Sequence, residues 1–282
     1  MDADQFLNDY SLEMTAKDLA SLREASALIP YGTQVSITFL ANESMDSRVA
    51  AATLVRECGL EPMPHIAARR VRSEEELDRF LSRLSTEALV NRVFLIAGDA
   101  SIPEGPYCDS IALLRSNILQ KNGIRAVGIA GYPEGHSHIP QSQLWDALKE
   151  KVRILQCFDM DCEIITQFGF DADPVLSWLA ELRQEGINAP VRIGLPGPAS
   201  IPTLLRFATR CGVSASAKVM AKYGVSMTRL IGSAGPDSLV EALLRRLSKD
   251  VHGEVYVHLY PFGGLLRATE WAKAYVECSR IA

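Results

Sequence analysis

The sequence has 282 residues, of which 48% are hydrophobic and 22% are charged, enough apolar material for the core of one large domain or two small ones. Its formal net charge of −5 and its pI near 5.6 argue against a nucleic-acid partner or an anionic membrane surface. No apolar run is long enough to span a bilayer, and the acidic start "MDADQFLNDY" lacks the apolar stretch of a signal peptide. We therefore expect a cytoplasmic protein.

Cysteine and histidine spacing gives no sign of a metal site. The six cysteines form no Cys-x-x-Cys pair and lie mostly in apolar runs, as reduced core cysteines do. The five histidines lack zinc-ligand patterns such as His-Glu-x-x-His. We expect neither a disulfide framework nor a bound metal.

From residue 34 onward, short apolar runs alternate with amphipathic segments. The runs predict strands at 34–40, 62–68, 92–99, 125–133, 163–168, 190–197, 213–217 and 254–260, the seventh being weak. The amphipathic segments predict helices at 47–59, 73–84, 110–123, 143–156, 173–186, 202–212, 237–247 and 265–277. Ser73 with Glu76 is a capping box, and Asp173 with Pro174 resembles a helix start.

Roughly eight strand–helix units in this length predict a single-domain (β/α)8 TIM barrel. The competing fold is an open doubly wound sheet, which usually carries a Gly-rich turn after its first strand. The segment "ANESMDS" after strand 34–40 has no glycine, which favours the barrel. Residues 1–33, which include the helix-like stretch 11–29, are predicted to be an N-terminal helical cap, and residues 34–282 to be the barrel.

Functional residues of such barrels lie at the carboxyl ends of the strands. The predicted strand ends carry polar residues but little charge: Thr38, His65, Asp99, Tyr132, Glu134, His136 and Gln167. They include no lysine suited to a Schiff base, no pair of carboxylates and no Ser-His-Asp order. Each residue alone has an ordinary structural explanation, so their shared position at one rim is the argument. It favours a site that binds a flat, hydrogen-bonding ligand.

Several motifs, in this order, resemble the methylenetetrahydrofolate reductase family. They are Gly98-Asp99, Tyr107 to Ser110, Tyr132 to His136, Leu148 to Val152 and Thr166 to Asp171. The last is quite specific, and the resemblance covers about residues 34–210. It implies the same barrel fold that the strand count predicts.

The resemblance implies an oxidoreductase that acts on CH–NH donors. In the family, NAD(P)H reduces FAD, and the flavin then reduces 5,10-methylenetetrahydrofolate to 5-methyltetrahydrofolate, a step of one-carbon metabolism and methionine biosynthesis. We therefore expect a flavoprotein with FAD as cofactor and NADH or NADPH as co-substrate. The sequence does not decide between the two nucleotides, and it leaves a homo-oligomer open.

The resemblance also implies roles for individual residues. Gln167 would hydrogen-bond the pterin, since an amide offers both a donor and an acceptor without a charge to desolvate. Asp99 would contact the pterin close to the flavin. The residues expected to line the flavin are His65, Ala97, Gly98, Asp99, Tyr107, Cys108, Tyr132, His136 and Lys151, with Lys151 at its phosphates.

Four features depart from the family pattern, one of which is a few extra residues between Lys151 and the fifth strand. The family's first strand usually ends Phe-Glu-Phe, and its glutamate is thought to donate a proton; on the predicted first strand, Thr38 stands there. Candidates for the acid are then Asp99, Glu43, Glu134, or a water held by Thr38. An arginine expected before Gly-Asp is Ala97. An aromatic residue expected to stack on the nicotinamide or pterin after the sixth strand is Ile201.

Three hypotheses follow. The leading one is a divergent reductase that uses FAD. The second is a flavin-independent reductase that passes hydride directly from NADH to the folate, which the residues at Ala97 and Ile201 favour. The third is a non-catalytic folate-binding barrel, which the missing glutamate favours.

Overall fold

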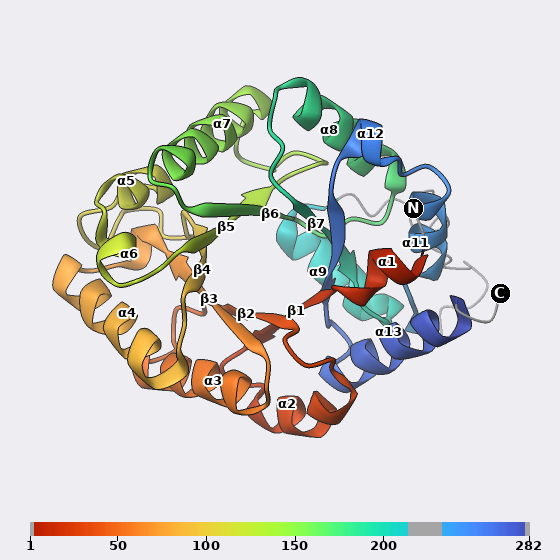
Figure 1. The fold of residues 1–282 in the computed structure, drawn as a ribbon, viewed down its shortest axis with the longest axis horizontal. Coiled ribbons are helices and arrows are strands. Elements are labelled where there is room, and N and C mark those ends of the chain that lie inside the picture. Colours follow the sequence, from red (N-terminus) through yellow and green to blue (C-terminus); the bar gives the residue numbers. More distant parts are fainter. Residues whose placement is uncertain (1–2, 214–232, 280–282) are drawn as a thin grey trace.

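The protein is a closed barrel of eight parallel strands (Figure 1), which confirms the predicted (β/α)8 fold. The computed structural model describes residues 3–213 and 233–279. The barrel strands are β1 (Ser11–Thr15), β2 (Gln34–Thr38), β3 (Glu61–Ala67), β4 (Arg92–Ile96), β5 (Ala126–Gly131), β6 (Asp161–Thr166), β7 (Val191–Pro196) and β10 (Val255–Tyr260). Each pairs in parallel with the next, and β10 pairs with β1 to close the ring.

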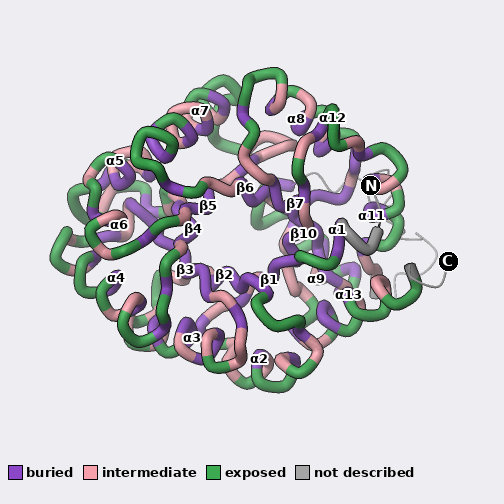
Figure 2. The backbone as a smooth tube through the Cα atoms, in the orientation of Figure 1, coloured by how far each residue is buried: buried purple, intermediate pink, exposed green. Residues whose placement is uncertain are grey.

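Helices surround the barrel and bury their apolar faces against it. They are α1 (Ala3–Asn8), α2 (Leu19–Ala25), α3 (Met45–Glu57), α4 (Glu74–Ala88), α5 (Ser110–Arg115), α6 (Ile118–Lys121), α7 (Gln141–Cys157), α8 (Ala172–Gln184), α9 (Ile201–Cys211), α11 (Asp237–Leu244), α12 (Lys249–His252) and α13 (Leu265–Ser279). Short 3-10 turns span Ser26–Leu28 and Ala68–Arg70. Figure 2 shows buried residues along the strands and on the helix faces that meet them. No helix within residues 3–213 and 233–279 combines the length and apolarity needed to cross a bilayer.

The first barrel strand is β1, not the segment 34–40 predicted from the sequence. Residues 11–15 lie between β10 and β2 in the ring, so the prediction of a helical cap is wrong for them. Leu12 and Met14 are buried in the core cluster that the surrounding helices complete. Ser11, Glu13 and Thr15 alternate with them, so they point into the barrel.

The weak strand predicted at 213–217 lies, apart from Val213, outside the described residues. β7 pairs directly with β10 over six residue pairs, so the eighth strand of the ring is β1. The two-residue strands β8 (Ala199–Ser200) and β9 (Ser233–Ala234) form a separate antiparallel pair.

Two predicted helix boundaries are corrected. The helix expected at 110–123 is two helices, α5 and α6, because Asn117 between them is in the left-handed region with φ of 61°. Asp171 rather than Asp173 caps α8, and its side chain accepts the backbone N–H of Asp173. The Ser73 cap of α4 is confirmed, with its hydroxyl accepting from the N–H of Glu76.

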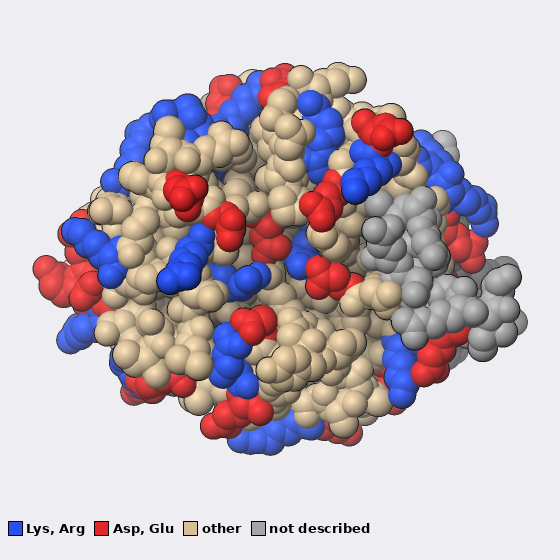
Figure 3. Space-filling model, viewed as in Figure 1, with Lys and Arg blue, Asp and Glu red and all other residues tan. Residues whose placement is uncertain are grey.

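A polar network fills the amino end of the barrel. Gln34 Nε2 donates to Glu163 Oε1 at 2.6 Å, and Arg192 Nε donates to Glu163 Oε2 at 2.8 Å. Arg92 completes it with a 2.8 Å bond to Gln34 Oε1. Figure 3 shows this face, with acidic and basic side chains around its central hollow. Because these groups hydrogen-bond one another, we expect the functional site at the opposite end of the barrel, at the carboxyl ends of the strands.

Candidate active site

Glu13 stands on β1 and points into the barrel between two histidines. Its Oε2 lies 3.8 Å from Nε2 of His65 on β3 and 3.9 Å from Nε2 of His258 on β10. Both imidazoles are buried, whereas 22% of the Glu13 side chain is exposed. The carboxylate is therefore the member of this group that a ligand in the barrel mouth can reach.

The two histidines are held differently. His258 Nδ1 lies 2.7 Å from the hydroxyl of Ser11, the residue two before Glu13 on the same strand. A hydroxyl that donates to Nδ1 leaves a proton on Nε2, which then faces the Glu13 carboxylate. His65 packs its ring 4.7 Å from that of Phe94, and its Nδ1 has no hydrogen-bond partner in the described part of the chain.

Charge in this cluster favours an ionised Glu13. Burial raises the pKa of Glu13, but the hydrogen bond from His258, the charges of both histidines and the Thr38 hydroxyl outweigh it, so the pKa is lowered. Burial lowers the pKa of His65 to about 4, although the Glu13 carboxylate opposes this shift. At neutral pH the cluster therefore combines a carboxylate with a neutral His65. A ligand that excludes water from Glu13 would raise its pKa again and favour proton uptake.

Thr38 stands on the second strand of the ring. It lies on β2 next to β1, where it pairs in register with Thr15, and its buried hydroxyl lies near the Glu13 carboxylate. The first strand of the ring is β1 rather than segment 34–40, and the residue of β1 that points between the two histidines is Glu13.

Gln167 follows the last residue of β6 and lies at the mouth. Its Oε1 accepts the N–H of Phe168 at 3.1 Å, and its own N–H donates to the carbonyl of Gly131 at 2.8 Å. Gly194 on β7 is required here, because a Cβ at this position would lie 2.5 Å from the Thr166 carbonyl oxygen. A cavity of only about 10 Å³, also lined by Glu134, adjoins the side chain of Gln167.

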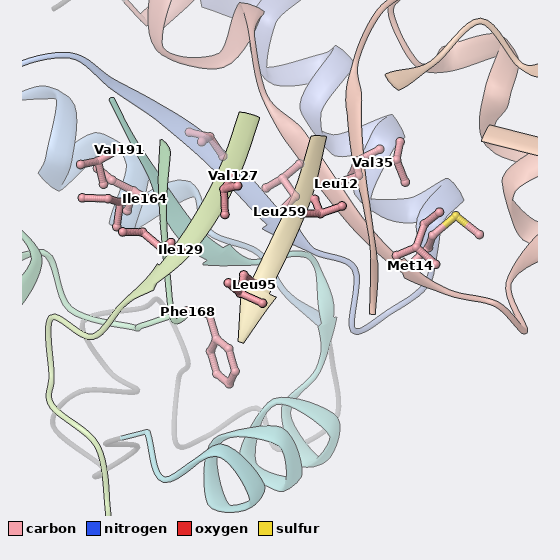
Figure 4. Packing of buried hydrophobic residues seen from close by; sticks show 14 of the residues in the cluster. Leu12, Met14, Val35, Leu95, Val127, Ile129, Ile164, Phe168, Val191 and Leu259 are labelled. Atoms are coloured by element: carbon pink, nitrogen blue, oxygen red, sulfur yellow. The ribbon is translucent and has the colours of Figure 1, made fainter. Parts of the chain in front are cut away.

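Helix α9 and a group of aromatic rings wall the mouth on the β6, β7 and β10 side. Phe207 of α9 stacks on Phe262 at 4.1 Å, and Phe262 meets Phe168 at 4.8 Å. Figure 4 shows Phe168 extending toward this helix. Beyond the helix, a Cβ at Gly212 would lie 3.1 Å from Cβ of Ser137 in the β5–α7 loop. The end of α9 thus reaches the loop that carries Tyr132 and Glu134.

The other residues expected at the flavin lie in varied surroundings. Tyr132 meets His136 edge-on at 5.4 Å, which places both in the β5–α7 loop near the mouth. Tyr107 is buried, and its hydroxyl donates to Glu74 of the outer helix α4 at 3.3 Å. Lys151 of α7 is partly buried near Asp109 and Cys162, and burial lowers its pKa.

Asp99 is exposed and paired with an arginine. Its Oδ1 accepts from Arg70 at 3.0 Å, and this hydrogen bond lowers the pKa of the carboxyl. Ala97 and Cys108 are exposed beside it in the same β4–α5 loop, and Gly98 has a φ of +91°. Ile201 is buried as the first residue of α9, so it offers little surface for stacking on a ring.

The chain matches the model of a known family over residues 13–261: methylenetetrahydrofolate reductase. The protein belongs to the methylenetetrahydrofolate reductase family. The match begins at Glu13, the residue that stands between the two histidines.

Curated relatives in this family share modest identity. The chain is 33% identical over 88 residues to methylenetetrahydrofolate reductase 2 of Saccharomyces cerevisiae, covering 30% of this chain and 13% of the relative. It is 26% identical over 178 residues to methylenetetrahydrofolate reductase (NADH) 1 of Arabidopsis thaliana, covering 57% of this chain and 29% of the relative. The aligned part therefore spans less than a third of the length of these relatives.

Two solved structures share the fold. An uncharacterised Clostridium thermocellum protein that binds two copies of 5-methyl-5,6,7,8-tetrahydrofolic acid has a TM-score of 0.61 at 13% identity, covering 98% of each chain. Dihydropteroate synthase from Thermus thermophilus has a TM-score of 0.52 at 13% identity, covering 99% of this chain and 96% of the other. At 13% identity, these two structures support only the barrel fold of this member of the reductase family.

Sequence reasoning missed Glu13 and His258. The alternation of Leu12 and Met14 with polar residues was the available signal for β1, but the surrounding sequence looked helical. His258 lay inside a correctly predicted strand, and only the position of Glu13 gives it a role.

Proposed function

We propose that this protein reduces 5,10-methylenetetrahydrofolate to 5-methyltetrahydrofolate with NAD(P)H as the hydride source. The observation that carries the proposal is Glu13, a carboxylate between His65 and His258 at the mouth of a barrel of this family. The folate-binding Clostridium thermocellum barrel of the same fold is described as binding the product proposed here.

The reaction needs one proton and one hydride. When the bond between the bridging methylene carbon and N10 breaks, N10 takes a proton and an N5 iminium remains. The hydride from C4 of the nicotinamide then adds to the iminium carbon and makes the methyl group, leaving NAD(P)+. We assign the donation of this proton to Glu13. General acid catalysis of this kind typically raises the reaction rate by about 10²–10⁴-fold.

His258 would hold the Glu13 carboxyl group in a fixed orientation. His258 is tied to Ser11 on one side and faces Glu13 on the other, which fixes the direction of its Nε2. Folate over the carboxylate would exclude water and raise the pKa of Glu13, so that it is protonated when the ring opens. Gln167, at the same mouth, would pair with donor and acceptor groups of the pterin edge.

The residues expected to hold FAD do not fit that cofactor as this chain arranges them. Lys151, expected at the phosphates, is near Asp109 and Cys162, and the Tyr107 hydroxyl is bonded to Glu74. Asp99 is bonded to Arg70, and the cavity beside Gln167 has room for about one water molecule.

This misfit favours the flavin-independent form of the reaction, in which the nicotinamide passes hydride directly to the folate. Because the Gln167 cavity is small, the pterin can enter only if α9 or the β5–α7 loop moves aside. We therefore expect substrate binding to shift α9 relative to Ser137.

The test combines a visible spectrum with an isotope label. The purified protein should lack flavin absorbance and still convert methylenetetrahydrofolate to methyltetrahydrofolate with NADH. NADH carrying deuterium at C4 should place the label in the methyl group, whereas a reduced flavin holds hydrogen on nitrogen, where it exchanges with water. A yellow protein whose product lacks deuterium in the methyl group would support the FAD mechanism instead. Folded protein that binds folate but forms no methyltetrahydrofolate would refute the proposed activity.

A further inference from the structure

A large cavity lies beside the mouth and has no role in the reaction proposed above. It has a volume of about 390 Å³ and opens between the ends of β2 and β3 and helices α3 and α4. Phe39 and Ala67 line it, one residue beyond Thr38 and two beyond His65 on their strands. The cavity thus opens beside the ends of the strands that carry Thr38 and His65.

A buried arginine links the cavity to that site. Arg48 of α3 is 8% exposed, and its guanidinium lies 4.7 Å from the ring centre of Phe39 and 4.2 Å from that of Phe80. Nη2 donates to the backbone carbonyl of His65. Nε has no acceptor, and none of the ion pairs between described residues includes Arg48. A buried cation with an unused donor indicates a site built for something more than packing.

Two carboxylates accompany Arg48 in the cavity wall. Glu43 and Glu76 both line it, and their charges stabilise the protonated Arg48 against burial, which lowers its pKa to about 10. Glu43 Oε2 accepts the N–H of Leu40 at 3.4 Å, whereas Oε1 has no described partner. A carboxylate can accept hydrogen bonds from two neighbouring hydroxyl groups, such as those of a ribose. Many sites select NAD over NADP with an acidic residue that accepts a hydrogen bond from the ribose 2′-hydroxyl.

The rest of the cavity suits the remaining parts of a nucleotide. Ile66, Leu77 and Phe80 supply an apolar wall for an adenine ring. Arg70 and Arg72 stand at the rim, where Arg72 is 74% exposed and only loosely paired, 3.7 Å from Glu104. An exposed arginine at this point can bind a pyrophosphate between cavity and mouth.

We propose that this cavity holds the adenosine half of NADH, with Glu43 and Glu76 at the adenine ribose, and that it makes the protein select NADH over NADPH. The proposal rests on the proposed function, which places the nicotinamide beside Glu13. A 2′-phosphate would meet two carboxylates in a partly buried site, which disfavours NADPH.

The experiment measures binding of NADH and NADPH by fluorescence without folate, so that it does not depend on turnover. NADH should bind at least about tenfold more tightly than NADPH, a difference of about 1.4 kcal/mol. Glu76→Gln should narrow this ratio mainly by improving NADPH binding. Glu75→Gln, an exposed neighbour on the same helix that does not line the cavity, is the matched control and should leave the ratio unchanged.

A second variant tests the location independently of charge. Ala41→Trp adds a large ring at the cavity edge and should weaken binding of NADH and of ADP-ribose while leaving the thermal unfolding midpoint and folate binding unchanged. Equal affinity of the wild type for NADH and NADPH, an unchanged affinity ratio in Glu76→Gln, or wild-type NADH binding in Ala41→Trp would overturn the proposal. NADH binding at the cavity without any methyltetrahydrofolate formation would instead refute the proposed function and leave this site standing.

Discussion

At the scale of single residues, a substitution of Gln167 best distinguishes effects on folate binding from effects on nucleotide binding. Gln167→Ala should raise KM for methylenetetrahydrofolate, because a pterin group would be left unpaired at a cost of about 1–3 kcal/mol, or about 5- to 150-fold. NADH affinity should stay at the wild-type value. Gln184→Ala, an exposed amide on α8, serves as the control. Equal losses for folate and NADH would mean that Gln167 only supports the fold.

His65 makes a prediction about acid stability. Its folded pKa of about 4 lies below the ordinary value of 6.5, so the unfolded chain binds more protons between these values and stability falls as pH drops through them. A shift of this size corresponds to about 3 kcal/mol. The free energies of unfolding of wild type and His65→Gln, measured in urea, should therefore depend differently on pH. Between about pH 6.5 and about pH 4, the wild type should lose up to about 3 kcal/mol more stability than the variant. Parallel pH profiles would show that burial does not depress this pKa.

Some site residues were predictable because their neighbours determine their position. Gln167 and His65 follow or end apolar runs, so their place at the mouth follows from the strand pattern. Glu13 was not predictable in this way, since Leu and Met beside it favour helices in isolation. The pairing of Ser11 with His258, far along the chain, is what makes this segment a strand. The local signal, the alternation of Leu12 and Met14 with polar residues, is too short to outweigh the helical character of the surrounding sequence.

At the scale of elements, β1 decides whether the N-terminal segment is a cap or part of the barrel. Leu12 is fully buried between β1 and the surrounding core, so Leu12→Ala should destabilise the protein by about 2–5 kcal/mol. Lys17→Ala, exposed just after the strand, should change stability by less than about 0.5 kcal/mol. Denaturant unfolding measures both, and equal small effects would mean that the barrel does not need this strand.

Helix α9 can be tested as the element that must move. In a Cys211→Ser background, Ser137→Cys with Gly212→Cys should form a disulfide. The two Cβ atoms would lie 3.1 Å apart, and a loop shift of a few tenths of an ångström brings them to the usual disulfide spacing of about 3.5–4.5 Å. Oxidation should abolish folate reduction, and reduction of the disulfide should restore it. The folate-reducing activity of the Ser137→Cys single variant should be unchanged by the oxidant. Full activity in the crosslinked protein would show that substrate enters without moving α9.

At the scale of the whole molecule, the sequence predicted the barrel because its central strands are continuous apolar runs separated by amphipathic helices. The predicted count of eight strands agrees with the barrel, although one of the eight is β1, which the sequence placed in an N-terminal cap. The burial of Lys151 and the pairing of Tyr107 with Glu74 depend on how helices pack outside the barrel. Motif order alone therefore does not reveal these contacts, on which the proposal of a flavin-independent reaction rests.

The most direct measurement compares wild type with Glu13→Gln in methyltetrahydrofolate formation from methylenetetrahydrofolate and NADH. Glutamine keeps the size of the side chain but cannot supply the proton, so product formation should fall by about 10²–10⁴-fold while NADH binding and the thermal unfolding midpoint are retained. Product formation by Glu13→Gln at the wild-type rate, or none by folded wild type, would contradict the assignment of this barrel mouth as the reductase site.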